Sequence, residues 1–296
     1  MRRRTPALIV FASLAGLLPA SPAFAQTLSD SLVERIRAGT NGIVLAGDSV
    51  VVPLVGTPTL PLVEVQISGT GPYRFLVDLG SNVTLLRRSV VDASRSTVVV
   101  ERSTSDIVHV KTITLGDARL EAVTVASYDD LDVDGVLGYN VLRHSSFTLD
   151  FPGQRLVLHR RALRRPDNRT VFSYQLVNRM PSITVRLGND SLLVNLDTGA
   201  TEWMTVPPAL QDRLHWAAPP IPGRTTFNNQ TGSTRVLEGH LVDSLRFGEF
   251  VVASPLVYVN PDAEEPWLGA AAMASAVWTF DPARRRVEVR TPAPDR

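Results

Sequence analysis

The feature that most constrains this chain is an apolar segment that ends in Asp-x-Gly and occurs twice. The first copy reads FLVDLG and contains Asp78 and Gly80, and the second reads LVNLDTG and contains Asp197 and Gly199. The aliphatic residues before each acid predict a strand, and the glycine lets the backbone turn sharply beside it. One such junction is common in turns, but two in matching surroundings predict a carboxylate at a strand end in each half of the chain.

The surroundings of the two junctions repeat as well. In each half an apolar-apolar-Gly segment follows, ending at Gly138 and Gly269, and nine residues later a strand pattern begins at Phe147 and Trp278. The two acids are 119 residues apart and the two later glycines 131, so the second half carries a net insertion, which we place near residues 219–223. Repetition at this scale predicts an all-β fold of two homologous lobes, related by a pseudo-twofold axis, with few short helices.

The chain divides into five predicted parts. These are a signal peptide at 1–25, an N-terminal helical lead-in at 26–48, a first lobe at 49–160, a linker at 161–170 and a second lobe at 171–291. The lead-in contains a capping box that begins at Ser31, and Gly39 is placed to end its helix. The linker is rich in arginine, which is consistent with a solvated spacer or with an anion-docking patch. The absence of interleaved aromatic residues favours the spacer.

The N-terminus has the pattern of an export signal. Three arginines precede an apolar run over residues 7–20, which is too short to span a bilayer comfortably, and Ala23-Phe24-Ala25 matches a small-x-small cleavage site. We therefore expect a mature chain that starts at Gln26, has no stable membrane span and is periplasmic or secreted. The alternative is that the apolar run stays attached as a membrane anchor.

Composition excludes several kinds of function. The chain has no cysteine, which removes disulfides, thiol chemistry and cysteine-bound metals, and its 30 basic and 29 acidic residues leave no charge excess suited to nucleic acid. The five histidines are scattered without ligand spacing, so we expect no metal and no cofactor. We expect a monomer.

A pseudo-twofold axis would bring Asp78 and Asp197 together at the face that the two lobes share. Two adjacent buried carboxylates cannot both ionise, so they hold one proton between them and one serves as base while the other serves as acid. Such a pair can take a proton from water and give one to a carbonyl oxygen. This chemistry hydrolyses an amide without a metal or a covalent nucleophile.

These motifs resemble those of a two-lobed bacterial aspartic protease of the retropepsin/pepsin superfamily. The family pattern Asp-Thr/Ser-Gly-Ala/Ser is matched by DLGS from Asp78 and by DTGA from Asp197, and its later apolar-apolar-Gly by VLG and WLG. The resemblance extends over residues 50–290. It implies retropepsin/pepsin-like β-barrel lobes and an exported aspartic endopeptidase that hydrolyses peptide bonds of a peptide or protein substrate. The water would be activated by the dyad of Asp78 and Asp197.

The resemblance also assigns supporting roles. It gives support of the catalytic loops to Gly80, Ser81, Thr198, Gly199 and Ala200. It places substrate-covering hairpin tips at Ser103, Thr104, Ser105, Asp106, Asn228, Asn229 and Gln230. Ser81 is expected to be able to hydrogen-bond Asp78.

One position departs from the family pattern. Leu79 stands where the family has Thr or Ser, whose hydroxyl reaches across to the other catalytic loop, so Thr198 can make this contact and Leu79 cannot. The departure leaves open a catalytically weak or inactive protein that binds peptides or other ligands on the same fold. A retaining glycosidase that uses the same two acids is a further alternative, which the absence of an aromatic-rich α/β alternation disfavours.

Overall fold

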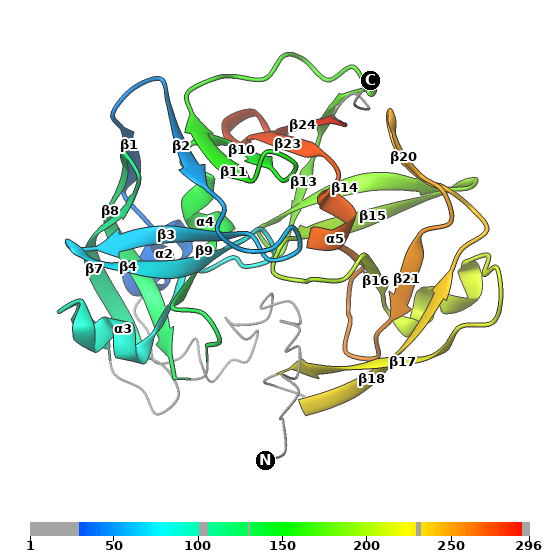
Figure 1. Ribbon diagram of the computed structural model, residues 1–296, viewed down its shortest axis with the longest axis horizontal. Helices are drawn as coiled ribbons and strands as arrows, with labels where there is room; N and C mark the ends of the chain where they lie inside the picture. Colours follow the sequence, from blue (N-terminus) through cyan, green and yellow to red (C-terminus); the bar gives the residue numbers. More distant parts are fainter. Residues whose placement is uncertain (1–29, 101–105, 130, 229–231, 292–296) are drawn as a thin grey trace.

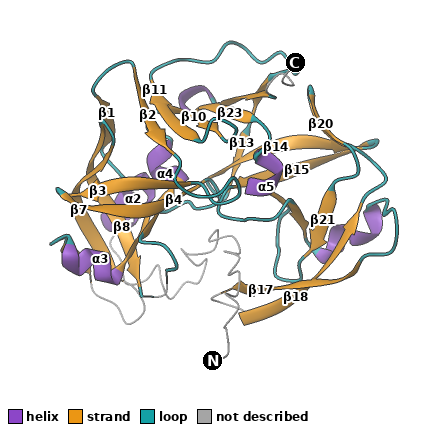
Figure 2. Ribbon diagram, in the orientation of Figure 1, coloured by secondary structure: helices purple, strands orange, loops and turns teal. Residues whose placement is uncertain are grey.

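The computed structural model describes residues 30–100, 106–129, 131–228 and 232–291. Within them the chain folds mostly into strands, which form two lobes and a sheet that joins them (Figure 1). The helices are short and lie at the ends of strands (Figure 2). They are α2 (Asp30–Ala38), α3 (Arg88–Ala93), α4 (Tyr139–Leu142) and α5 (Ala270–Met273), with 3-10 turns η2 (Pro208–Arg213) and η3 (Pro282–Arg284). This arrangement confirms the predicted all-β fold with two barrel-like lobes.

The first lobe is a closed barrel. Its strands follow the order β1-β8-β5-β9-β4-β3-β7-β6, and β7 also pairs with β8, which closes a ring of six strands. Strand β7 pairs with β8 along its whole length, and on its other edge its first half pairs with β6 while its second half reaches β3. The strands are β1 (Gly42–Leu45), β3 (Leu62–Ile67), β4 (Thr70–Asp78), β5 (Leu85–Arg87), β6 (Thr97–Val100), β7 (Asp106–Leu115), β8 (Ala118–Tyr128) and β9 (Gly135–Gly138).

The second lobe repeats this strand order but stays open. Its sheet runs β17-β18-β21-β16-β22-β15-β14-β19-β20, with β13 on the far side of β14. The single strands β7 and β8 of the first lobe correspond to broken pairs here, β18 with β19 and β20 with β21. The strands are β13 (Gln175–Val177), β14 (Met180–Leu187), β15 (Asp190–Asp197), β16 (Met204–Val206), β17 (Ile221–Asn228), β18 (Gly232–His240), β19 (Leu245–Phe247), β20 (Phe250–Val252), β21 (Leu256–Val259) and β22 (Trp267–Gly269).

The break in the second lobe has a local cause. Ser254 adopts a left-handed backbone conformation with φ of 47°, and Pro255 has no N–H to continue a strand ladder. Leu241, the residue after β18, pairs with Trp216 in an isolated bridge. The extra residues of the second half are therefore divided between the segment around η2, which includes the predicted region 219–223, and the interruption after β18.

A third sheet joins the two halves of the chain. Its order is β12-β24-β23-β10-β11-β2, so that β10 of the first half pairs with β23 of the second. The register sets Thr148 opposite Thr279, and their hydroxyl groups are 2.9 Å apart. These threonines occupy the same place in the two repeats, so the pseudo-twofold axis passes between them. The strands are β2 (Ser49–Pro53), β10 (Ser146–Asp150), β11 (Arg155–His159), β12 (Val171–Ser173), β23 (Val277–Asp281) and β24 (Arg286–Arg290).

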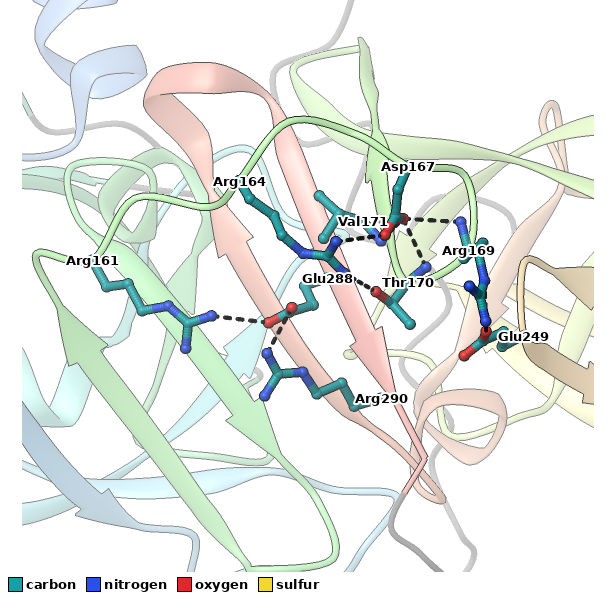
Figure 3. Close-up of polar contacts among 9 residues, drawn as sticks. All are labelled: Arg161, Arg164, Asp167, Arg169, Thr170, Val171, Glu249, Glu288 and Arg290. Atoms are coloured by element: carbon teal, nitrogen blue, oxygen red, sulfur yellow. Dashed lines mark hydrogen bonds and ion pairs between the residues drawn. The ribbon is translucent and has the colours of Figure 1, made fainter.

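The segment between β11 and β12 has no regular structure and is tied down by ion pairs (Figure 3). Arg161 lies 3.3 Å from Glu288 of β24, a carboxylate that Arg290 also contacts at 2.7 Å. Arg169 lies 2.6 Å from Glu249, so both ends of the segment are attached to the second half of the chain. These contacts make it an anchored connection rather than a free spacer.

The N-terminal part of the described chain packs on the first lobe. Helix α2 buries Leu32 and Ile36 and ends at Gly39, whose φ of +77° closes the last turn. The side chain of Asn140 in α4 donates to the carbonyl of Ile36 at 3.0 Å, which fixes the helix to the end of β9. The predicted signal peptide lies outside the described residues. No helix in the described ranges is long and apolar enough to cross a membrane.

Candidate active site

Asp78 is the last residue of β4, at the lip of the first barrel. Its four-residue approach from Phe75 is buried, because β4 lies in the middle of the ring between β3 and β9. The parallel register of β4 and β9 sets Asp78 opposite Gly138, and the acid is only 2 % exposed. A Cβ added to Gly138 would overlap the carbonyl of Val83. The glycine is therefore required for the loop after Asp78 to pack directly on β9.

Asp197 holds the matching place in the second lobe. It ends β15, pairs in parallel register with Gly269 of β22 and is 1 % exposed. A Cβ on Gly269 would overlap the carbonyl of Glu202, as a Cβ on Gly138 overlaps that of Val83. The two halves thus use the same device, in which a glycine supports the loop that follows the acid.

The two carboxyl groups meet between the lobes. The backbone N–H of Gly199 donates to both of them, at 3.2 Å to Asp78 and 3.0 Å to Asp197, so that an oxygen of each acid lies on the same donor. Each acid also lies against the glycine of the opposite loop, since a Cβ on Gly80 would overlap Asp197 and one on Gly199 would overlap Asp78. Only glycine at these two positions lets the acids approach so closely.

Burial controls the protonation of the pair. It raises the pKa of Asp78 to about 6, against the opposing effect of N–H donors from Gly80 and Gly199. The pKa of Asp197 is raised well above its ordinary value by burial and then by the negative charges of Asp78 and Glu202. At mildly acidic pH the pair therefore retains a proton, as expected for adjacent buried carboxylates.

The two acids differ in their donors. Asp78 accepts from Gly80 at 2.8 Å and from Gly199, and the N–H of Ser81 also faces it. Asp197 accepts from Gly199 and from Ala200 at 3.1 Å, but its buried Oδ2 has no donor among the described residues apart from a proton shared with Asp78. Because hydrogen bonds to a carboxylate favour its ionised form, the shared proton is favoured on Asp197.

Thr198 links the two lobes through its side chain. Its hydroxyl donates to the carbonyl of Val77 at 2.7 Å and accepts from the N–H of Leu79 at 3.0 Å. Leu79 is fully buried in the apolar core and makes no corresponding bond toward the second loop. The side-chain connection between the two loops that follow the acids is therefore one-sided.

The remaining loop residues act through their backbones. Gly80, Gly199 and Ala200 supply N–H donors, so the apolar side chain of Ala200 is no obstacle to its place in the loop. The hydroxyl of Ser81 donates to the carbonyl of Val83 at 2.7 Å rather than to Asp78. The expected side-chain bond from Ser81 to Asp78 is wrong, because the hydroxyl closes its own turn.

Of the predicted hairpin-tip residues, the described structure includes Asp106 and Asn228. Ser103, Thr104, Ser105, Asn229 and Gln230 lie outside the described residues. Asn228 is the last residue of β17. Asp106 is buried at the start of β7 and paired with Arg88 of α3, which itself lies 3.0 Å from Asp129. Asp106 thus anchors the base of its hairpin.

Sequence reasoning missed a charged pair beside the second acid. Glu202 follows Asp197 by five residues, is 3 % exposed and lies 3.3 Å from Arg224 of β17. The signal that the sequence offered for this pair was an acidic residue shortly after the Asp197 motif. Arg224 carried no signal, because it is 22 residues away.

Comparison with known proteins agrees with the geometry. Residues 63–141 match the family model described as aspartyl protease, a segment that runs from β3 to α4 and includes Asp78 and Gly138. No curated protein matches the chain. The match confirms the predicted resemblance to aspartic proteases and supports a peptidase-like function. In the described ranges, no group of three side chains of the metal-binding types is placed to hold a metal ion.

Proposed function

We propose that this protein is an aspartic endopeptidase that hydrolyses peptide bonds with a water molecule activated by Asp78 and Asp197. The observation that carries the proposal is that two buried carboxyl groups at equivalent strand ends accept from the same N–H, that of Gly199, and that each rests on the glycine of the other lobe. The family match over the first of these loops adds to it. The substrate is a peptide or protein, and the enzyme acts as a monomer without a cofactor.

The different surroundings of the acids divide their roles. Above about pH 6, where Asp78 has lost its proton, Asp78 is the base that removes a proton from water, and Asp197 is the acid that protonates the carbonyl oxygen. As water adds to the carbonyl carbon, its proton passes to Asp78 and that of Asp197 passes to the carbonyl oxygen. The tetrahedral intermediate then loses the amine, which takes the proton from Asp78, while a hydroxyl group of the intermediate returns a proton to Asp197. Both acids return to their starting states, so no covalent intermediate forms.

The test is cleavage of an unfolded protein by the mature chain across pH 3 to 8, beside D78N and D197N. General acid–base catalysis contributes about 10²- to 10⁴-fold, so each variant is expected to lose at least that much activity. The asparagine side chain has nearly the same shape, and circular dichroism checks that each variant folds. Cleavage that survives in both variants would end the proposal.

A second candidate is a catalytically weak or inactive peptide-binding protein on this fold. The one-sided bond of Thr198 favours it, because Leu79 cannot return the contact that holds the acids in one plane. Calorimetric titration with a peptide that is bound but not cleaved, under conditions where the parent shows no turnover, would support this candidate.

We further propose that the protein is exported and acts outside the cytoplasm. The support is the basic, apolar and small-x-small order of residues 2–25. N-terminal sequencing of protein recovered from cell fractions is expected to begin at Gln26 in the periplasm or medium. A chain retained in the cytoplasm with its first residues intact would contradict the proposal.

A further inference from the structure

The surroundings of the two acids differ most at one equivalent position. The residue five places after Asp78 is Val83, and the residue five places after Asp197 is Glu202. Both are buried, and the carbonyl of each packs on the glycine that supports its loop. The backbone geometry is thus shared, but the second lobe places a carboxylate where the first has an isopropyl group.

Glu202 has a cationic partner, and its own backbone N–H and the side chain of Trp267 also act on it as hydrogen-bond donors. Its Oε2 lies 3.3 Å from Arg224, and its Oε1 lies 3.5 Å from the hydroxyl of Thr205. Both contacts are long, and the Nε of Arg224 is itself buried with no partner among the described residues. A buried ion pair of this quality does not stabilise a fold relative to apolar residues of similar size. Fold stability is therefore a weak reason for a glutamate at this position.

Charged and titratable groups surround Glu202 from several elements. Arg224 of β17 stacks over Tyr258 of β21, with its guanidinium 4.5 Å from the ring centroid. Burial raises the pKa of this tyrosine, and the negative charge of Glu238 of β18 adds to the rise. Burial raises the pKa of Glu202, and the positive charge of Arg224 opposes that rise. The negative charge of Glu202 also contributes, after burial and the charge of Asp78, to the raised pKa of Asp197.

We infer that Glu202 is a positioning residue that holds the shared proton of the acid pair on Asp197, with Arg224 keeping Glu202 charged for this task. The inference rests on the proposed function and explains why the two acids differ in which of them holds the proton. A fixed negative charge on one side disfavours ionisation of the nearer acid, so Asp197 stays the proton donor and Asp78 the base. The pair also keeps its proton to higher pH than it would beside a valine.

The test compares E202Q and E202V with the parent. Loss of the negative charge lowers the pKa of Asp197, so the high-pH limb of the kcat/KM profile is expected to move down by about 0.5 to 1 unit, a 3- to 10-fold loss on that limb. E202V copies the residue of the first lobe and replaces E202Q in the test if E202Q does not fold.

Two variants serve as controls. E202D keeps the negative charge and is expected to keep the parental pH profile. E249Q removes an exposed carboxylate from the Arg169 pair in Figure 3 and is expected to shift nothing.

A second readout does not require activity. Carboxyl ¹³C NMR of protein labelled at aspartate, assigned with D197N, is expected to show Asp197 titrating at lower pH in E202Q than in the parent. An unchanged titration of Asp197 would overturn the inference even if the parent cleaves peptides. A shifted titration in a protein with no peptidase activity would uphold the placement of the proton and refute the proposed function instead.

Discussion

At the scale of single residues, the site depends on a few buried polar groups, and a substitution that removes one of their hydrogen bonds leaves a buried partner unpaired. Thr198 is the clearest case, because its hydroxyl satisfies a buried carbonyl and a buried N–H of the opposite lobe at once. Unsatisfied buried groups cost more than a hydrogen bond contributes, so removal of one oxygen affects two partners. The side chain of Leu79 makes no equivalent hydrogen bond to the second loop, so this side-chain link between the loops depends on Thr198.

T198V tests this tie. Valine has the same shape but leaves Val77 and Leu79 without partners, so the free energy of unfolding is expected to fall by about 2 to 4 kcal/mol. T205V is the matched control, since Thr205 is equally buried but makes only one long contact. Urea unfolding of both variants measures the difference, and equal losses would show that the bridging hydroxyl contributes nothing special.

The raised pKa of Asp78 predicts a dependence of stability on pH. The folded state holds the proton up to about pH 6, whereas the ordinary value is 3.8. The unfolding free energy therefore falls as pH rises through this window, because the unfolded chain releases the proton first. D78N removes the loss, and its stability relative to the parent is expected to grow between pH 4 and pH 7 by on the order of 1 to 3 kcal/mol.

Urea unfolding at the two pH values checks this expectation. D92N, on the exposed face of α3, provides a control that changes one aspartate without touching the acid pair. A D78N curve that runs parallel to the parental curve would contradict the raised pKa.

At the scale of elements, each acid is placed by a pair of parallel strands. Strands β4 and β9 carry Asp78 and Gly138 side by side, and β15 and β22 carry Asp197 and Gly269. The glycine permits the loop after the acid to cross the end of its neighbour without a gap. The position of the carboxylate is therefore a property of strand pairing, and a defect in the pairing moves the acid.

G138A tests the role of the crossing. An added methyl group would overlap the carbonyl of Val83, so the loop must shift, and we expect a loss of about 3 kcal/mol or more together with most of the activity. G42A in β1 is the control, because a methyl group there meets nothing within 4 Å, and its effect is expected to stay within about 0.5 kcal/mol. Thermal unfolding with matched activity assays would show whether the two glycines differ in this way.

At the scale of the whole molecule, the halves are joined by more than the chain that connects them. The pairing of β10 with β23 stacks Phe147 on Phe280 with ring centroids 4.8 Å apart, in the centre of a core that continues through both lobes. This sheet fixes the lobes relative to each other, and the acid pair forms where they meet. Covalent continuity at residues 161–170 should therefore be dispensable once the protein has folded.

A cut in the connection tests this expectation. A protease site introduced between the exposed Arg164 and Arg165 is expected to give two fragments that migrate together in native size exclusion and separate only in denaturant. Combining the cut with F280A, which removes one ring of the stacked pair, is expected to weaken the association. Fragments of the parental sequence that part under native conditions would show that the shared sheet does not hold the halves together.

Local sequence patterns were sufficient to predict the fold class and the positions of the two acids at strand ends. Strand patterns, the Asp-x-Gly turns and the repeat at Gly138 and Gly269 depend on residues close in sequence, so each was readable by itself. The Ser81 bond was predicted wrongly for a related reason, because a hydroxyl in a tight turn has several nearby acceptors and the sequence does not rank them.

By itself, the sequence determined that two similar β lobes each end a buried strand in a carboxylate, because alternation and turn chemistry are local properties. Tertiary structure alone decided that the first ring closes and the second stays open, that the hydroxyl of Ser81 bonds the carbonyl of Val83, and that Glu202 meets Arg224. The first and last of these features come from contacts between segments far apart along the chain, and such contacts form only once the strands have paired in their native register.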